Sequence, residues 1–157
     1  MAAVRRTAEV EWTGTIARGV GHASGASGAL KDLAMTAASR LGEPEGKTTP
    51  EELIAAAHAA CFTMALGSIL AGQRTPLERL QTTATVTLET SGVVRIATSQ
   101  LDVHGVVPGA DAASFEQAAH EAERGCPVSR ALQGNVEISV QARLDGASTA
   151  PAPRSSA

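Results

Sequence analysis

The sequence is poor in aromatic residues and in cysteine: its 157 residues include two Phe, one Trp, no Tyr and two Cys. Aromatic side chains are the surfaces on which bases and sugars stack, so their scarcity argues against both kinds of ligand. Basic residues are not in excess either, because 13 stand against 16 acidic ones and the net charge is -3. Binding of phosphate backbones needs a basic field, so we expect no nucleic acid partner.

The sequence also offers no recognisable targeting segment. Arg5 and Arg6 are followed by no apolar run, which predicts neither a secretory signal nor a membrane anchor. The longest apolar stretch, residues 53–71, is mainly Ala and is interrupted by polar residues and glycine, which favours a buried core helix over a membrane span. We therefore expect a cytoplasmic protein with no membrane partner. Two cysteines in such a reducing compartment do not usually form a permanent disulfide.

Alternation of polar and apolar residues predicts several β-strands. Ala8, Val10 and Trp12 share one face of the first, which is expected to be half-buried, and Ser91-Gly92 is typical of a hairpin turn. The expected strand ranges are 7–13, 15–23, 80–90, 93–103 and 136–144. The segment between the second and third strands begins with residues 24–47, which are rich in Gly, Ser and Ala and predict a long loop with one helical turn.

Helix signals lie between these strands. Thr49 can cap a helix, Pro50 suits its first position and Glu52 completes a capping box. This helix is expected to reach about Leu70 and to end at Gly72. Since it is apolar on nearly all sides, we expect it in the middle of the fold.

Two further helices and a tail complete the expected organisation. Residues 111–124 have a helical pattern that Gly125 ends, and Cys126-Pro127 begins a short helix. The order of elements indicates an α+β fold, with a single domain over residues 1–145. Residues 146–157 are rich in Gly, Ser, Ala and Pro, which predicts a disordered tail.

The two cysteines are the side chains with the clearest chemical potential. A reactive cysteine must be a thiolate, and Cys126 stands at a helix start whose N–H groups and dipole can lower its pKa. Cys61 lies mid-helix and needs a cation from another segment. His58 is one turn before Cys61 and could pair with it, although a lone His in an Ala-rich helix is more often a core residue bonded to the backbone. A zinc site using both cysteines, His58 and His120 matches no compact ligand spacing.

Two motifs carry a resemblance to a known family. The run TPEELIAAAHAACFTMAL at residues 49–66, together with GCPVS at residues 125–129, resembles the OsmC/Ohr family of osmotically induced and organic-hydroperoxide-resistance peroxidases, and most of all its OsmC branch. The likeness extends in layout over most of residues 7–144. It implies an α+β fold with antiparallel sheets around a long central helix, and an intertwined homodimer.

The resemblance also implies which residues act. Cys61 matches the attacking cysteine, Cys126 the resolving one, Glu51 the acid at the helix start and Arg40 the activating arginine. A guanidinium from Arg40 would be the cation that Cys61 needs, and Glu51 could hold it by a bidentate pair. Around Arg40 this sequence departs from the family, because aliphatic residues replace aromatic ones at Ala37, Ala38 and Leu41.

The function that the resemblance implies is a thiol-dependent peroxidase for organic hydroperoxides, and also hydrogen peroxide, in oxidative and osmotic stress defence. A Cys61 sulfenic acid would condense with Cys126, and an external dithiol reductant such as a lipoylated protein would reopen the disulfide. This chemistry requires no metal, flavin or haem cofactor. Two other classes stay open: a redox-responsive binding or sensing module without efficient turnover, and a metal-binding structural protein.

The spacing of two of these residues bears on the assembly. Glu51 and Cys61 are ten positions apart in one expected helix, which corresponds to roughly 15 Å along its axis. That separation is too wide for one guanidinium to touch both side chains. We therefore predict a homodimer in which one chain supplies Arg40 and Glu51 and its partner supplies Cys61.

Overall fold

The structure is a computed structural model that describes residues 3–75 and 77–145, so the tail predicted at residues 146–157 lies outside the described residues. The chain divides into two compact units, an N-terminal unit up to Leu53 and a C-terminal unit from Ile54. The single domain expected over residues 1–145 stays a prediction.

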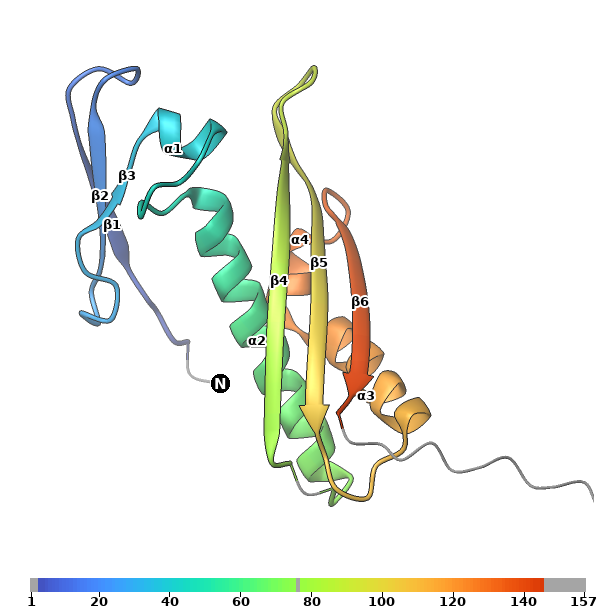
Figure 1. Cartoon of the computed structure of the whole chain (residues 1–157). Helices are drawn as coiled ribbons and strands as arrows, with labels where there is room; N and C mark the ends of the chain where they lie inside the picture. Colours follow the sequence, from blue (N-terminus) through green and yellow to red (C-terminus); the bar gives the residue numbers. More distant parts are fainter. Residues whose placement is uncertain (1–2, 76, 146–157) are drawn as a thin grey trace, which may run out of the picture. The chain divides into compact units, whose positions relative to one another are not determined.

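The N-terminal unit contains a three-stranded antiparallel sheet in the order β1-β2-β3 (Figure 1). Its elements are β1 (Ala8–Thr13), β2 (Val20–Gly25), β3 (Leu33–Met35) and α1 (Ala37–Leu41). The first two strands were expected, but β2 begins five residues later than predicted. The delay has a local cause, because the N–H groups of Arg18 and Gly19 both donate to the carbonyl oxygen of Thr15 and form a turn there.

The expected long loop at residues 24–47 is wrong in part, since it contains β3, whereas the one helical turn expected there corresponds to the five-residue α1. Strand β3 has only three residues, too few for an alternation pattern, and forms by pairing with β2. Helix α1 has a capping box in which Ser39 takes the place usually held by Glu or Gln. Thr36 and Ser39 each accept the other's backbone N–H at 3.0 Å.

Strand β1 is less buried than its alternation predicted. Val10 is 57% exposed, and of the strand's residues only Trp12 is partly buried. The Trp12 ring lies over Gly21 of β2, where an added Cβ would stand 2.7 Å from a ring carbon. Glycine is therefore required at that position to let the indole pack on the strand.

Helix α2 (Pro50–Gly72) has the expected start and end. The backbone N–H of Glu52 donates to Thr49 Oγ1 at 3.1 Å, which is the predicted cap. The other half of the expected capping box does not form, because the Glu52 carboxylate accepts from the Thr48 hydroxyl at 2.7 Å and not from the Thr49 backbone N–H. By length and composition α2 could cross a membrane, but the core helix of a soluble protein passes the same test.

The C-terminal unit is built on a second sheet, in the order β4-β5-β6. Strands β4 (Arg79–Glu89) and β5 (Arg95–Val106) form the expected antiparallel hairpin, and Gly92 in its turn has a φ of +83°. Strand β6 (Glu137–Leu144) pairs with β5 in parallel, which corrects the expectation of purely antiparallel sheets. The cause is the crossover through α3 (Ala112–Gly125) and α4 (Pro127–Leu132), because only such a connection can return the chain in the same direction.

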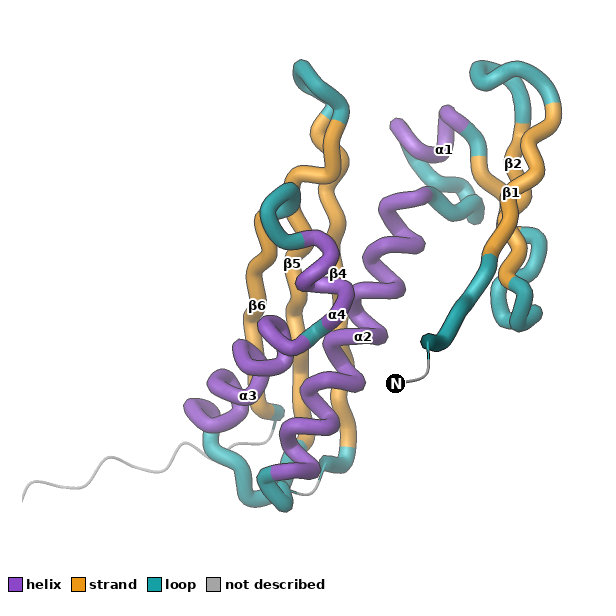
Figure 2. Tube along the Cα trace, turned by 180° about the vertical axis from the view of Figure 1, so that it is seen from behind, coloured by secondary structure: helices purple, strands orange, loops and turns teal. Residues whose placement is uncertain are grey.

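Helices α2, α3 and α4 lie on one face of this sheet (Figures 1 and 2). Side chains from α2, β5 and α3 form the buried core between them. Its members are Phe62, Leu66, Leu70, Leu101, Val103, Val107, Phe115, Ala118, Ala119, Ala122 and Cys126. Phe115 packs directly on the backbone of β5, where a Cβ added to Gly105 would stand 2.5 Å from the ring. The other face of α2 is less covered than expected, with Ala57 and Ala60 exposed and Met64 68% exposed.

Candidate active site

The structure brings the two cysteines together. Cys61 comes from the middle of α2, and Cys126 stands at the junction between α3 and α4. Both are free thiols, and their side chains lie close enough for each to shift the pKa of the other. Cys61 is partly buried against the core cluster, whereas Cys126 is 0% exposed. A reagent from solvent therefore reaches Cys61 first.

Cys126 terminates one helix and begins the next. Its backbone N–H donates to Glu123 O at 3.2 Å, which closes the C-terminus of α3. Its sulfur takes the N-cap position of α4 and accepts the N–H of Ser129 at 3.5 Å. Pro127 suits the first helical position because it has no N–H that would need a partner there.

The pKa of Cys126 lies below that of an ordinary thiol. Burial alone would raise it, but the sulfur accepts hydrogen bonds from the backbone N–H of Ser129, the Cys61 thiol, the Ser129 hydroxyl and the Val128 N–H, and together they lower the pKa. The direction is the one expected for a cysteine at a helix start.

The pKa of Cys61 is raised. Burial is the main cause, and the hydrogen bond with Cys126 raises it further, while the backbone N–H of Val128 lowers it in part. From the sequence we expected no helix end near Cys61, yet the backbone N–H of Val128 in the first turn of α4 acts on its sulfur. Since the pKa of Cys61 is nevertheless raised and that of Cys126 is lowered, Cys126 is the thiol of the pair that ionises more readily.

Arg40 and Glu51 form an ion pair within the N-terminal unit. Arg40 ends α1 and Glu51 lies in the first turn of α2. Arg40 Nη2 donates to Glu51 Oε1 at 2.8 Å, and Nε donates to the same oxygen at 3.1 Å. The hydrogen bond to Glu51 raises the pKa of Arg40. Burial raises the pKa of Glu51, but hydrogen bonds, that from Arg40 first, outweigh burial and leave this pKa lowered.

This geometry makes Arg40 a fixed cation. The Glu51 side chain is 10% exposed and the Arg40 side chain 42% exposed, so the carboxylate anchors a guanidinium that stays accessible. Both bonds use Nε and Nη2, and Nη1 is the nitrogen that this pair does not use. The pairing itself is observed; the role of the pair toward Cys61 stays a prediction.

His58 is fully buried and bonded to two serines. Its Nδ1 lies 2.7 Å from Ser99 Oγ of β5, and its Nε2 lies 2.8 Å from Ser129 Oγ of α4. Burial lowers the pKa of His58 and favours the neutral ring. A core histidine was expected, but with backbone partners rather than serine hydroxyls. Since both ring nitrogens are engaged, a direct His58–Cys61 pair does not form.

Sequence reasoning missed Ser99 and Ser129. The GCPVS motif contains Ser129 and could have drawn attention to it, whereas Ser99 had no signal beyond an inward position in β5. Among the described residues no group of three or more His, Cys, Asp or Glu side chains could hold a metal ion. His120, the remaining zinc candidate, lies 3.9 Å from Glu116 on its own helix.

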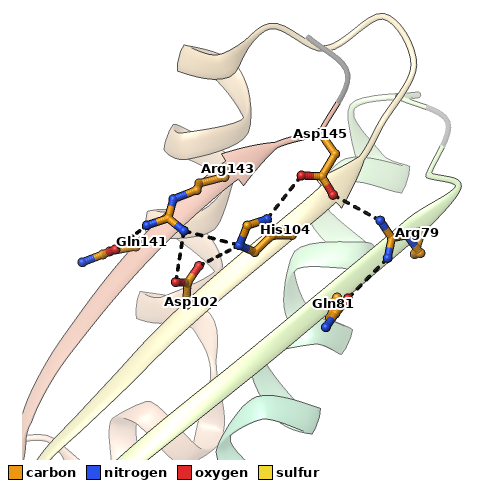
Figure 3. A network of polar contacts seen from close by, with 7 residues as sticks. All are labelled: Arg79, Gln81, Asp102, His104, Gln141, Arg143 and Asp145. Carbon is orange, nitrogen blue, oxygen red and sulfur yellow. Dashed lines mark hydrogen bonds and ion pairs between the residues drawn. The ribbon is translucent and has the colours of Figure 1, made fainter.

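A second polar cluster crosses the sheet of the C-terminal unit (Figure 3). His104 Nδ1 lies 3.2 Å from Asp145, and its Nε2 lies 3.4 Å from Asp102. Arg143 and Arg79 extend the cluster through Asp102 at 3.5 Å and Asp145 at 3.2 Å. These side chains are 37–57% exposed and include no nucleophile, so the cluster is a surface ion-pair network of small energetic weight.

Comparisons with known proteins, both by sequence and by fold, identify the same family of proteins as similar to this chain. Residues 42–141 match the family model described as OsmC-like protein, a span that contains both cysteines. The chain is 37% identical over 139 residues to peroxiredoxin OsmC of Escherichia coli K12, covering 88% of this chain and 96% of that protein. It is 33% identical to the organic hydroperoxide resistance protein OhrA of Bacillus subtilis 168, covering 70% and 77%. A crystal structure of an organic hydroperoxide resistance protein OsmC from Legionella pneumophila matches with a TM-score of 0.68 and 30% identity, covering 90% and 98%.

Proposed function

This chain belongs to the OsmC-like protein family, and on that premise we propose that it is a thiol-dependent hydroperoxide reductase whose reaction uses Cys61 and Cys126. Relatives named peroxiredoxin and organic hydroperoxide resistance protein support a role in removing peroxides. The observation that carries the proposal is that a partly exposed Cys61 and a buried Cys126 lie close enough to shift each other's pKa. Two thiols in contact can form a disulfide with little movement.

The proposed reaction has two steps. The Cys61 thiolate attacks the terminal oxygen of the hydroperoxide, the O–O bond breaks, and the leaving alkoxide takes a proton to become an alcohol, which leaves Cys61 as a sulfenic acid. The Cys126 thiolate then attacks the Cys61 sulfur, and hydroxide leaves as water after taking a proton from solvent. An external dithiol reopens the disulfide by thiolate exchange and is itself oxidised.

Arg40 supplies the positive charge in this proposal. The thiol pair on its own favours a thiolate on Cys126, so a guanidinium beside Cys61 would be needed to shift the charge to the attacking sulfur. The anchored, accessible guanidinium of Arg40 has the required chemistry, and Glu51 holds it in place.

We further infer a homodimer with shared sites. The ten-residue spacing of Glu51 and Cys61 favours a site to which one chain gives the ion pair and its partner the thiol. The exposed face of α2 supports this arrangement, because Met64 and the small residues Ala57 and Ala60 leave apolar surface that a second copy could cover.

The substrate and partners follow from the same premise. We expect organic hydroperoxides to be preferred and hydrogen peroxide to be accepted, with a dithiol such as a lipoylated protein as reductant. The expected setting is oxidative and osmotic stress in the cytoplasm, with no metal or organic cofactor required by the chemistry.

Single-cysteine variants test the assignment. Cys61→Ser should abolish consumption of cumene hydroperoxide, whereas Cys126→Ser should react once and accumulate a Cys61 sulfenic acid, detected by dimedone labelling and intact mass. Rapid oxidation of Cys61→Ser together with an inert Cys126→Ser protein would show that the two roles are reversed.

Subunit mixing tests the shared site. Inactive Cys61→Ser and inactive Arg40→Ala proteins would be unfolded together, refolded and assayed. A mixed dimer then holds one site with both defects and one intact site, so activity should return. If mass spectrometry confirms mixed dimers and no activity returns, each chain assembles its own site.

A redox-responsive sensing module is the second candidate, favoured by one feature: the pKa is lowered at the buried Cys126 and raised at the more accessible Cys61. Such a module would form the disulfide with peroxide but turn over slowly. Steady-state consumption of cumene hydroperoxide with dihydrolipoamide separates the two, since multiple turnovers within minutes require the enzyme.

A further inference from the structure

The strongest feature outside the proposed thiol chemistry is the buried path that ends at Cys126. Ser99 of β5, His58 of α2 and Ser129 of α4 are all at most 2% exposed. The two contacts of the His58 ring are 2.7 Å and 2.8 Å long. Ser129 also contacts the Cys126 sulfur: its backbone N–H donates at 3.5 Å, and its hydroxyl is near enough to lower the pKa of that thiol. Three side chains from three elements therefore form one polar path that leads to the sulfur.

The hydrogen bonds along this path run in one direction when Cys126 is a thiolate. A thiolate can only accept hydrogen bonds, so the Ser129 hydroxyl must use its single proton to donate to the sulfur. The Ser129 oxygen must then accept a hydrogen bond from His58 Nε2, which makes His58 the Nε2–H tautomer. Nδ1 of that tautomer is an acceptor and is satisfied by the Ser99 hydroxyl, which donates.

The opposite direction weakens the thiolate. If His58 carried its proton on Nδ1, Nε2 would become an acceptor and would compete for the single proton of Ser129. Cys126 would then lose one of its hydrogen-bond donors. Ser99 bonds Nδ1 in both cases, because a hydroxyl can donate to an unprotonated Nδ1 or accept from Nδ1–H. A thiolate at Cys126 favours the direction in which Ser99 donates.

We propose that His58 is a positioning residue for disulfide formation: as its Nε2–H tautomer, with Ser99 donating to Nδ1, it orients the Ser129 hydroxyl onto Cys126 and so supports the thiolate that attacks the Cys61 sulfenic acid. The inference rests on the proposed function for that last step only. In the step, the S–O bond of Cys61 breaks, an S–S bond forms, and the departing hydroxide leaves as water with a proton from solvent.

Apart from Cys61, the side chains of this path are the ones best placed to affect the ionisation of Cys126. Cys61 of α2 is the titratable group in direct contact with it. Arg124 of α3 and Arg130 of α4 are exposed, and Glu123 is only partly buried and is bonded to Cys126 through its backbone oxygen. On β5, Asp102 and His104 belong to the network drawn in Figure 3 and alternate with the inward-facing Ser99, Leu101 and Val103.

The first test needs neither variant of the path nor peroxide. In ¹⁵N-labelled protein carrying Cys61→Ser, which keeps a hydroxyl donor beside Cys126, the two ring nitrogens of His58 are observed by NMR above the pKa of Cys126. We expect a protonated Nε2 and an unprotonated Nδ1. An Nδ1–H tautomer under those conditions overturns the proposal.

The second test titrates Cys126 by the pH dependence of its alkylation in the same background. Ser129→Ala should raise the apparent pKa of Cys126 by about one unit, because a hydrogen bond to a charged group is lost. Ser99→Ala should raise it by a smaller amount, about half a unit, although Ser99 does not contact the sulfur. Ser99→Thr keeps the hydroxyl and suits a strand, and should restore the value.

The third test follows the resolving step after one equivalent of peroxide. Near neutral pH, disulfide formation should slow about tenfold in Ser129→Ala, in line with the one-unit shift, and by less in Ser99→Ala. A merely structural role predicts lower melting temperatures with an unchanged Cys126 titration, and that result contradicts the proposal. If the alanine variants do not fold, the NMR measurement still decides. A wild-type chain that fails to consume peroxide refutes the proposed function, while the titration and the tautomer judge the path independently.

Discussion

The two units of the chain hold their polar side chains in opposite ways. In the N-terminal unit, Arg40 and Glu51 keep full charges in an ion pair whose guanidinium is 42% exposed. In the C-terminal unit, His58 and Cys126 are buried, and His58 is bonded to neutral hydroxyl groups. A charge near the surface remains partly solvated, whereas a buried group must limit its charge or surround it with donors. One unit thus offers a permanent cation, and the other offers sulfurs whose protonation is adjustable.

The difference in packing gives the largest expected effect. Phe115→Ala removes a fully buried ring that packs on β5, so the free energy of unfolding should fall by about 3–5 kcal/mol. Val10→Ala, at a position of β1 that is 57% exposed, should cost less than about 0.5 kcal/mol. Denaturant unfolding at matched protein concentration measures both. A Val10 cost close to that of Phe115 would show that β1 is covered in solution.

The charge of the N-terminal unit should matter next. Arg40→Met keeps an unbranched side chain in place of the aliphatic part of arginine and removes the cation, and we expect the rate of Cys61 oxidation to fall on the order of 100-fold, as when a preorganised electrostatic donor is lost. Arg40→Lys keeps the charge without the paired geometry and should recover only part of the rate. Stopped-flow mixing with cumene hydroperoxide gives the three rates. Equal rates of Cys61 oxidation in the three proteins would show that Arg40 takes no part in that step.

Acid should affect the two units at different pH. Burial lowers the pKa of His58 below 6.5, so the unfolded chain binds that proton more readily; the contribution to stability is complete above about pH 6.5 and is lost as the pH falls below it. Although burial raises the pKa of Glu51, its hydrogen bonds leave that pKa below 4.5, so its contribution is present above about pH 4.5 and is lost as the pH falls through the lowered value.

Amide hydrogen exchange measured residue by residue should therefore detect loosening of the C-terminal unit first on acidification. His58→Gln, which does not titrate, should remove the change that begins near pH 6.5 and leave the one below pH 4.5. Simultaneous loosening of both units in the unmodified chain would contradict the prediction that they lose stability at different pH.

The surface network of Figure 3 should give the smallest effect. Arg143→Gln breaks its contact of 3.5 Å with Asp102 at a site where the arginine is 57% exposed, and we expect a change of less than about 0.5 kcal/mol in stability. Peroxide consumption should be unchanged. A clear loss of activity would mean that this face of the sheet takes part in the function.

Elements with strong local signals could be predicted from the sequence. Helix α2 begins at Pro50 after a Thr49 cap and ends at Gly72, as expected, and Cys126-Pro127 correctly indicated a second helix start. The hairpin of β4 and β5 followed from alternation and a Ser-Gly turn. In each case residues a few positions apart determine the backbone conformation, so the information is contiguous in the chain.

What could not be predicted depends on residues far apart in the chain. Strand β3 is too short to show a pattern and exists through its pairing with β2. The parallel pairing of β5 with β6 is a property of the crossover and not of either strand. Ser99 stands 41 positions from His58, and nothing in its neighbourhood marks it as a histidine partner. For the same reason the approach of Val128 to Cys61 was not foreseen.

The double capping role of Cys126 has a consequence for redox chemistry itself. Helix α4 has only six residues, too few to persist alone, and the sulfur of Cys126 is the acceptor at its first turn. Ionisation of the thiol and formation of α4 therefore favour each other. The factor by which the helix raises the ionisation constant of the thiol equals the factor by which the thiolate raises the equilibrium constant for helix formation. A disulfide sulfur is neutral and a poorer acceptor than a thiolate, so in the proposed reaction oxidation of Cys126 would weaken this cap. The local stability of α4 would then depend on the oxidation state of the chain, and the proposed reductant would meet the disulfide at the start of a less stable helix.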